Sequence, residues 1–180
     1  MLDWACGDGR NLILLNNLGL KVCAFEITDK ICNGVKKRMK NFGVNVDIRV
    51  GRNSNVPFDS EYFDYVVASS SLYYVDHGEN FNANLAELAR VTKRGGYIIL
   101  TLAHPKTFVL KDAIEVEDSH FEITKDPYNL RNGDIFYVFK DKTAIVDKFS
   151  RYFDDICIGQ QNEDYYGMNI RLWLVVAKRK

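Results

Sequence analysis

The sequence predicts an α/β protein built on a parallel β-sheet, and two observations carry this prediction. The first is a strand end, a glycine turn and a helix start within residues 2–11, Leu-Asp-Trp-Ala-Cys-Gly-Asp-Gly-Arg-Asn. The second is a short apolar run, residues 21–25, that ends in Glu26. A strand, a helix and a second strand in this order form a βαβ unit, whose strands lie parallel in one sheet.

The glycine turn and the acidic residue together indicate a ligand that contains a nucleoside. Gly7 and Gly9 let the backbone turn sharply and approach a ligand closely. The helix that follows, predicted over 11–18 and ended by Gly19, presents backbone N–H groups at its start. An acidic residue such as Glu26, at the end of the second strand, can bind the two hydroxyls of a ribose.

The turn lacks one part of the dinucleotide fingerprint. In G-x-G-x-x-G the third glycine allows close packing of the helix, and Leu12 stands at that position. This mismatch counts against a nicotinamide oxidoreductase, which stays the third alternative.

The first stretch resembles the opening motif of class I S-adenosylmethionine-dependent methyltransferases, an acidic residue followed by alternating small residues. The corresponding positions are Asp3, Ala5, Gly7 and Gly9, and three of the four match well. Ala5 departs from the family, which usually has glycine there. The resemblance implies S-adenosylmethionine as the cofactor. It also implies a Rossmann-like fold with a mostly parallel seven-stranded sheet, helices on both faces and a C-terminal antiparallel hairpin.

A second stretch of this family is a helix that ends in R-V-x-x-P-G-G before the fifth strand. The apolar spacing predicts a helix over 81–92 and a strand over 97–102. The residues that match the family are Glu87, Arg90, Val91, Gly95 and Gly96. Arg94 replaces the usual proline, and the glycine pair predicts a left-handed turn.

The region between these stretches predicts a helix and two strands. Apolar residues spaced three or four apart predict a helix from 28 or 29 to 42, ended by Gly43. Alternation over 46–50 predicts a half-exposed strand at a sheet edge. Residues 57–59, Pro-Phe-Asp, resemble the family's approach to its fourth strand, and the apolar run 63–68 predicts a strand buried on both faces.

The resemblance implies a set of cofactor-binding residues. The predicted set is Asp3, Ala5, Cys6, Gly7, Gly9, Glu26, Asn53, Ser69, Ser70 and Tyr74. Asp3 is expected to organise the turn or to reach the cofactor's amino group through water. Arg52 stands where the family often has an acceptor for the adenine amino group, and arginine cannot accept a hydrogen bond. Adenine is therefore assigned to Asn53, to backbone groups or to stacking.

Two tyrosines follow the fourth strand, at the sheet edge where ligands of open α/β sheets bind. Tyr73 and Tyr74 stand where many relatives have histidines. One of the rings could lie over adenine or face the acceptor. The alternative is that both pack under the next helix.

The rest of the chain predicts an insertion followed by the end of the sheet. Residues 103–134 have mixed charge and no sustained period, which predicts an insertion near the acceptor site, with 107–131 as the specificity region. Residues 135–139 predict a strand and 142–153 a helix. The last predicted strands are 156–159 and 170–178, joined by a polar loop over 160–167.

The resemblance runs along nearly all of residues 1–180, which predicts a single domain. Relatives usually carry helices before the first strand that cover the cofactor, whereas Met1 falls inside that strand. We expect a truncated or misassigned start that lacks these helices, the alternative being an open pocket.

The composition indicates which partners and which cellular compartment to expect. Lysine plus arginine and aspartate plus glutamate both number 24, so the zero formal charge argues against nucleic acid as a partner. The four cysteines form no C-x-x-C pair, which predicts free thiols and no metal site. No apolar run could span a bilayer and no signal peptide is evident, so we expect a cytoplasmic protein without membrane partners.

The implied reaction is an in-line displacement, in which an acceptor atom attacks the sulfonium methyl group. The expected acceptor is a small molecule methylated at oxygen or nitrogen. His104 is the first candidate for a general base, and His77 with Asp76 is the second. The main alternative is a non-catalytic partner-binding module of the same fold. The oligomeric state is open, and a homodimer through the final hairpin is possible.

Overall fold

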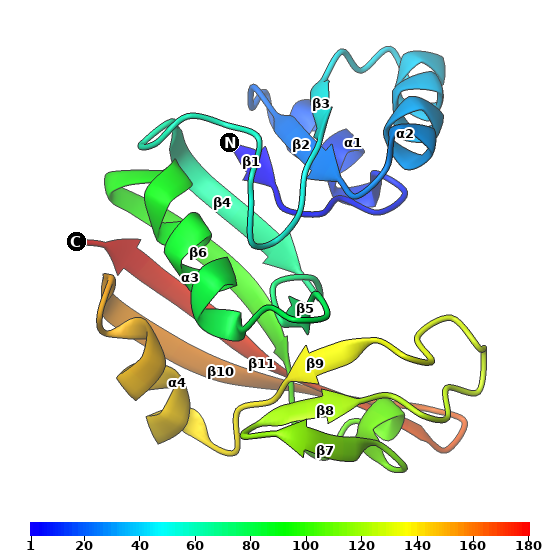
Figure 1. Cartoon of the computed structure of the whole chain (residues 1–180). Coiled ribbons are helices and arrows are strands. Elements are labelled where there is room, and N and C mark those ends of the chain that lie inside the picture. Colours follow the sequence, from blue (N-terminus) through cyan, green and yellow to red (C-terminus); the bar gives the residue numbers. More distant parts are fainter.

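The structure is a computed structural model that describes all residues from 1 to 180. Its centre is a seven-stranded sheet in the order β10-β11-β6-β4-β1-β2-β3 (Figure 1). The strands are β1 (Leu2–Asp3), β2 (Cys23–Glu26), β3 (Asp47–Val50), β4 (Phe63–Ser69), β6 (Thr92–Ala103), β10 (Phe153–Tyr165) and β11 (Met168–Arg179). β11 pairs antiparallel with both β6 and β10, and the other neighbours pair parallel. The predicted mostly parallel sheet with a closing hairpin is confirmed.

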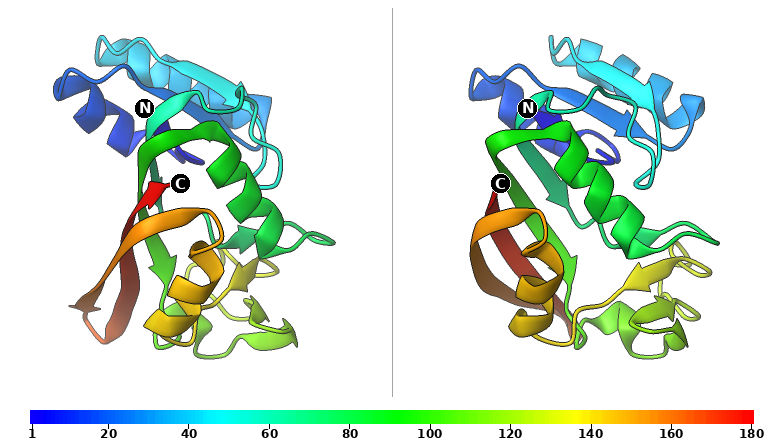
Figure 2. Two further views of the ribbon diagram at one scale, coloured as in Figure 1. Left: turned by 90° about the vertical axis from the view of Figure 1, so that its left-hand side faces the viewer. Right: turned by 60° about the vertical axis from the view of Figure 1, so that its left-hand side comes forward.

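Four α-helices pack against this sheet in two pairs. They are α1 (Arg10–Asn17), α2 (Asp29–Asn41), α3 (Phe81–Val91) and α4 (Lys142–Phe149). α1 and α2 form a small apolar core with β2 and β3, around Ala24 and Ile48. α3 and α4 belong to the larger core on the other face, and Figures 1 and 2 show the two pairs well apart with strands between them. None of these helices is both long and apolar enough to cross a membrane.

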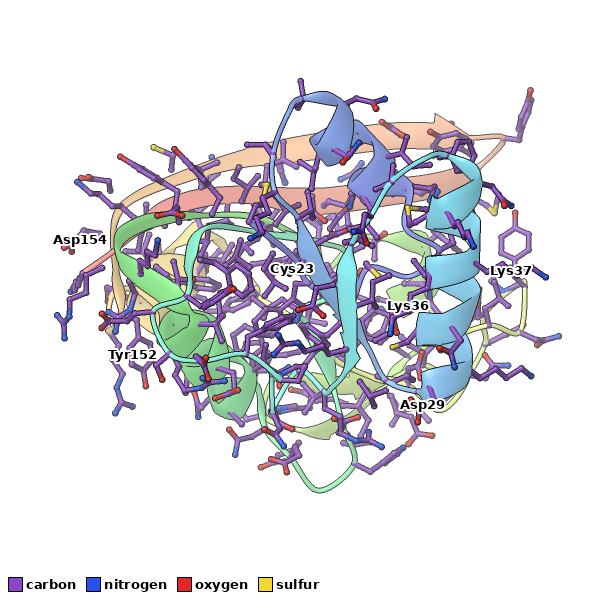
Figure 3. The ribbon with its side chains drawn as sticks, turned by 90° about the horizontal axis from the view of Figure 1, so that it is seen from above. Cys23, Asp29, Lys36, Lys37, Tyr152 and Asp154 are labelled. Carbon is purple, nitrogen blue, oxygen red and sulfur yellow. The ribbon has the colours of Figure 1, made fainter.

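The ends of α2 follow from its sequence. Thr28 precedes the helix, and its hydroxyl accepts a hydrogen bond from the backbone N–H of Ile31 at 3.2 Å. Gly43 follows the helix with a positive φ of 69°. Figure 3 shows α2, which carries Lys36 and Lys37, at the opposite end of the molecule from Tyr152 and Asp154.

One face of the sheet is uncovered over β4, β6 and β11. Tyr65 on β4 is 44% exposed, although the apolar run 63–68 predicted burial on both faces. Its register partner Tyr97 stacks on it with ring centroids 6.1 Å apart. The exposed side chains of this face also include Ile99, Leu174 and Val176. The predicted burial of residues 63–68 on both faces is wrong. The helices α1 and α2 pack on β2 and β3, and no helix of residues 1–180 covers this part of the sheet (Figure 2).

A second, four-stranded antiparallel sheet lies beyond the carboxyl ends of β4 and β6 (Figure 1). Its strands, in spatial order, are β5 (Tyr74–Val75), β9 (Ile135–Tyr137), β8 (His120–Glu122) and β7 (Ile114–Glu117), and the short helix η1 (Phe108–Leu110) precedes β7 in the chain. The predicted irregular insertion over 103–134 therefore contains two strands. The strand predicted over 135–139 belongs to this second sheet. β7 and β8 have only four and three residues, too few to give a sustained period in the sequence.

The final hairpin is longer than predicted. Residues 160–167 were expected to form a polar loop, but β10 continues to Tyr165. Tyr166 and Gly167 form the turn, with positive φ values of 54° and 87°, as in a tight two-residue hairpin. β10 is an edge strand with mostly exposed side chains, so polar residues there do not indicate a loop.

Candidate functional site

Two cavities lie at the carboxyl edge of the main sheet. The first, of about 530 Å³, lies between the glycine turn, the start of α1, the end of β4 and η1. The second, of about 340 Å³, lies between the end of β2, the 74–77 segment and residues 133–135. The residues that line both cavities are Ala5, Ser70, Ser71 and Tyr74. Nine of the ten predicted cofactor residues line one or both cavities, the exception being Gly9.

The glycine turn is left-handed at three positions. Ala5, Gly7 and Gly9 have φ values of 46°, 58° and 81°. A Cβ on Gly7 would meet no atom within 4 Å, so the backbone there borders open space. A Cβ on Gly9 would lie 3.0 Å from side-chain atoms of Val35 and Met39. Gly9 therefore serves the packing of α1 against α2, which explains why it lines neither cavity.

Glu26 lines the second cavity and holds the glycine turn. Its side chain is buried, with 7% of its surface exposed. Oε1 accepts a hydrogen bond from the N–H of Gly7 at 2.6 Å, and Oε2 accepts one from the N–H of Ile27 at 3.1 Å. An ionised carboxylate oxygen can accept two hydrogen bonds. Each oxygen of Glu26 therefore keeps one acceptor site, the number that the two hydroxyls of a ribose require.

Asp3 lines the first cavity with an unpaired acceptor. The residue is 1% exposed, and its Oδ1 accepts a hydrogen bond from Asn11 Nδ2 at 3.3 Å. The buried Oδ2 has no partner. Burial, with the negative charge of Glu26 as a smaller contribution, raises the pKa of Asp3 to about 7. A buried acceptor without a partner fits a ligand that brings a hydrogen-bond donor, such as an ammonium group.

Asn53 lines the second cavity, but its side chain binds the protein itself. Its Oδ1 accepts from Trp4 Nε1 at 2.7 Å. Its Nδ2 donates to the carbonyl oxygens of Ser71 and Tyr74, both at 2.9 Å. Both N–H groups are used, so Asn53 cannot donate to adenine and keeps a single acceptor site on Oδ1. The neighbouring Arg52 pairs with Asp76 at 2.9 Å.

The segment after β4 is also strained. Ser70 has a positive φ of 55°, and its N–H donates to Thr101 Oγ1 at 2.6 Å. Ser71 donates its hydroxyl to the carbonyl oxygen of Trp4 at 2.9 Å, and Ser69 lines the first cavity. Both non-glycine residues in the left-handed region at this edge, Ala5 and Ser70, lie on the wall shared by the two cavities. Such conformations persist where the surrounding structure holds them and are frequent at binding sites.

Three aromatic rings pack together at the wall that the two cavities share. Tyr73 stacks on Tyr74 with ring centroids 5.2 Å apart, and Phe136 packs edge-on against both, at 4.8 and 4.4 Å. Tyr74 lines both cavities, whereas Tyr73 lines the first. The two rings thus pack against each other and also border the cavities. Burial raises the pKa of both phenols, so both stay protonated at neutral pH.

Arg131 lines the first cavity and was not predicted as a site residue. Its Nε donates to the hydroxyl of Tyr74 at 3.3 Å, and its Nη1 pairs with Asp126 Oδ2 at 3.2 Å. The sequence places it at the end of the predicted specificity region. Nothing in its local pattern indicates that the side chain would turn toward Tyr74, fifty-seven positions earlier.

The structure does not bring His104 into either cavity. Its ring lies against Trp173, with centroids 4.4 Å apart, and its Nδ1 accepts from the N–H of Lys106 at 3.0 Å. Burial lowers the pKa of His104, so the ring is neutral at neutral pH. Because Nδ1 accepts the hydrogen bond from Lys106, the neutral ring carries its proton on Nε2. His77 lines the second cavity, on the side of Glu26. Cys6 lines the first, where burial raises the pKa of its thiol.

Comparison with known proteins agrees with this arrangement. The family model described as "Methyltransferase domain" matches residues 2–100. An uncharacterized methyltransferase of Bacillus subtilis (strain 168), YodH, is 28% identical over 99 residues. This match covers 55% of the present chain and 41% of YodH, so the chain spans less than half the length of that relative.

Two solved structures share the fold. One is a SAM-dependent methyltransferase from Methanosarcina mazei, with a TM-score of 0.76 and 21% identity, matched over 99% of this chain and 91% of its own. The other is the PH0226 protein from Pyrococcus horikoshii OT3, with a TM-score of 0.73 and 22% identity, matched over 99% of this chain and 81% of its own. At such identities the likeness establishes the fold. Since the family model covers more than half of the sequence, the chain belongs to the methyltransferase domain family.

Proposed function

We propose that the protein binds S-adenosylmethionine and transfers its methyl group to a small-molecule acceptor, at oxygen or nitrogen. The observation that carries this proposal is the pair of buried carboxyl groups at the two joined cavities. Glu26 has two acceptor sites toward the second cavity, and Asp3 has an unpaired oxygen at the first. A ligand with a ribose at one end and an ammonium group at the other satisfies both.

The residues present fit this cofactor. Glu26 would accept hydrogen bonds from the ribose hydroxyls, and Asp3 would take the amino group of the methionine part. Gly7 gives the room for a close approach, since a Cβ there would meet nothing. Ser70 and Tyr74 form the shared wall between the two ends. When bound, the cofactor supplies an electrophilic methyl group on a sulfonium centre.

The protein's contribution to the reaction would be orientation. Holding two reactants in the attack geometry can contribute about 7–11 kcal/mol to the rate. The first cavity offers few groups for base catalysis, because Cys6, Tyr73 and Tyr74 keep their protons at neutral pH. His104 lies outside the cavity and His77 borders the second. We place the acceptor in the first cavity. Because no histidine lines that cavity, we assign no histidine as the base.

The predicted insertion over 103–134 supplies one side of the first cavity. Its lining residues are Ala103, Thr107, Phe108, Val109 and Arg131. We propose that this segment selects the acceptor, because loops added at the ligand edge of an α/β sheet can vary without disturbing the sheet.

Ligand-dependent stabilisation tests the proposal. S-adenosylhomocysteine should raise the thermal unfolding midpoint of the protein, and NAD should not. Incubation with S-adenosylmethionine and pooled small hydroxy and amino compounds should then release S-adenosylhomocysteine. Binding without turnover in any pool would favour the non-catalytic alternative. Stabilisation by NAD instead would contradict the cofactor assignment.

A further inference from the structure

We propose that the acceptor carries an anionic oxygen group, above all a carboxylate, and that Arg131 binds it. This inference rests on the proposed function, since it concerns the acceptor side of the same site. Arg131 lies in the segment between β8 and β9, and it lines the first cavity but not the second. The guanidinium is therefore on the side assigned to the acceptor.

Hydrogen bonds hold the guanidinium of Arg131 in place but leave some of its N–H groups without a partner. Tyr74 accepts from its Nε and Asp126 from its Nη1, while Nη2 makes no hydrogen bond within the protein. A guanidinium has five N–H groups, so three of them remain for a ligand. The side chain is 34% exposed. A fixed, partly desolvated fork of this kind is well suited to a carboxylate.

The charge of Asp126 is already stabilised by backbone groups. Its side chain is fully buried and accepts hydrogen bonds from the N–H groups of Tyr128, Leu130 and Arg131. These bonds and the pairing with Arg131 lower its pKa. Asp126 is thus an internal anchor of the turn that fixes one nitrogen of Arg131, and the remaining donors keep their attraction for an anion.

The other charged side chains at the first cavity also favour an acceptor whose anionic group lies at Arg131. Arg10 also lines it, but its side chain is 84% exposed and pairs with Asp8. Asp8 pairs in addition with Arg38. Asp3 lies at the glycine turn, where an anion would be repelled once Asp3 is ionised. An anionic group therefore binds most favourably at Arg131.

The rest of the cavity is suited to an apolar body. Phe108, Val109, Phe136, Ile170 and Leu172 line it. A small acid with an aromatic or aliphatic body would contact these side chains while its carboxylate meets Arg131. The structure thus assigns an amphipathic carboxylic acid as the acceptor class, with a free phosphate or sulfate ester as the variant of the same chemistry.

Matched acid and amide pairs test this assignment. The protein, saturated with S-adenosylhomocysteine, is titrated calorimetrically with para-hydroxybenzoate and para-hydroxybenzamide, and with phenylacetate and phenylacetamide. We expect the acids to bind about tenfold more tightly than the amides, because a charge-assisted hydrogen bond is lost in the amide. Phenyl phosphate in the same titration shows whether the phosphate variant binds as well.

Arg131→Gln should remove the preference for the acid, whereas Arg131→Lys should keep part of it. Arg94→Gln, at an exposed side chain that lines neither cavity, is the matched control and should leave the preference unchanged. S-adenosylhomocysteine affinity, measured for each variant, should stay within about twofold of the wild-type value. That measurement shows that the variants remain folded and able to bind the cofactor product.

Two results would overturn the inference. One is equal affinity of acid and amide, or no binding of any acid, in wild-type protein that binds S-adenosylhomocysteine. The other is an acid preference that survives in Arg131→Gln. Failure of the wild-type protein to bind S-adenosylhomocysteine would instead contradict the proposed function, so the two failures are distinguishable.

Discussion

Glu26 Oε1 accepts a hydrogen bond from the backbone N–H of Gly7 at 2.6 Å, across nineteen positions of sequence. The bond ties the end of β2 to the glycine turn that follows β1. The residue assigned to the ribose therefore also sets the conformation of the turn beside it. The hydrogen bonds from the backbone N–H groups of Gly7 and Ile27 compensate for the burial of this carboxylate.

The left-handed conformation of Ala5 predicts a stabilising substitution. A left-handed helical conformation costs an L-residue about 1–2 kcal/mol, and glycine avoids this cost. Glycine also gains about 0.4–1 kcal/mol of freedom in the unfolded chain. We expect Ala5→Gly to raise the free energy of unfolding by about 0.5–1 kcal/mol in urea titrations.

Ala86→Gly is the matched control for this substitution. Ala86 lies inside α3, where glycine should lower the free energy of unfolding by about 1 kcal/mol. Equal destabilisation by Ala5→Gly and Ala86→Gly would show that Ala5 is not strained.

The raised pKa of Asp3 predicts a pH-dependent stability. The pKa of Asp3 is about 7 in the folded protein, whereas that of an exposed aspartate is 3.8. Between these values the folded state keeps a proton that the unfolded state has lost, so the free energy of unfolding falls as the pH rises. Above the folded pKa the contribution is constant. The total effect is on the order of a few kcal/mol.

Asp3→Asn removes the ionisable group with little change of shape. We expect the variant to be more stable than the wild type at neutral pH, with a difference that shrinks toward pH 4. Urea unfolding of both proteins over a pH series measures the difference directly. A difference that does not vary with pH would mean that Asp3 ionises in the folded protein as it does in water.

Asn53 is predicted to stabilise the protein before any ligand binds. Asn53→Ala leaves Trp4 Nε1 without its partner and removes one of the hydrogen bonds at each of the carbonyl oxygens of Ser71 and Tyr74. We expect a loss of about 2–3 kcal/mol in the free energy of unfolding of the ligand-free protein. Asn45→Ala, at an exposed position, is the control. Unchanged stability in Asn53→Ala would contradict this prediction and would leave ligand binding as the role of Asn53.

The parts of the fold that the sequence predicts are those with local signals. α2 begins after a capping threonine, Thr28, and ends before Gly43, and its apolar spacing is regular between them. Glu26 ends β2 as expected because a short apolar run closes at a charged residue. Gly95 has the predicted left-handed conformation, with φ at 76°, but it lies within β6 rather than at a turn before the strand.

The site residues that sequence reasoning misplaced depend on tertiary contacts. Ala103 lines the first cavity and His104 does not, because successive residues at a strand end point in opposite directions. Asn53 lines the second cavity as predicted, but its amide is also bound by Trp4, forty-nine positions earlier. The position of Arg131 follows from the turn around Asp126. Trp4 is far along the chain from Asn53, and Tyr74 is far from Arg131, so no local pattern indicates these contacts.

The central claim is that Glu26 and the glycine turn hold a nucleoside cofactor. Calorimetric titration of S-adenosylhomocysteine into the wild type, Glu26→Gln and the exposed control Asp29→Asn tests it most directly. We predict micromolar binding by the wild type and by Asp29→Asn. Glu26→Gln should lose roughly 1–3 kcal/mol of binding free energy, because an amide nitrogen cannot accept a hydroxyl hydrogen bond. Equal affinity of Glu26→Gln and the wild type, or no binding by the wild type, would contradict the account.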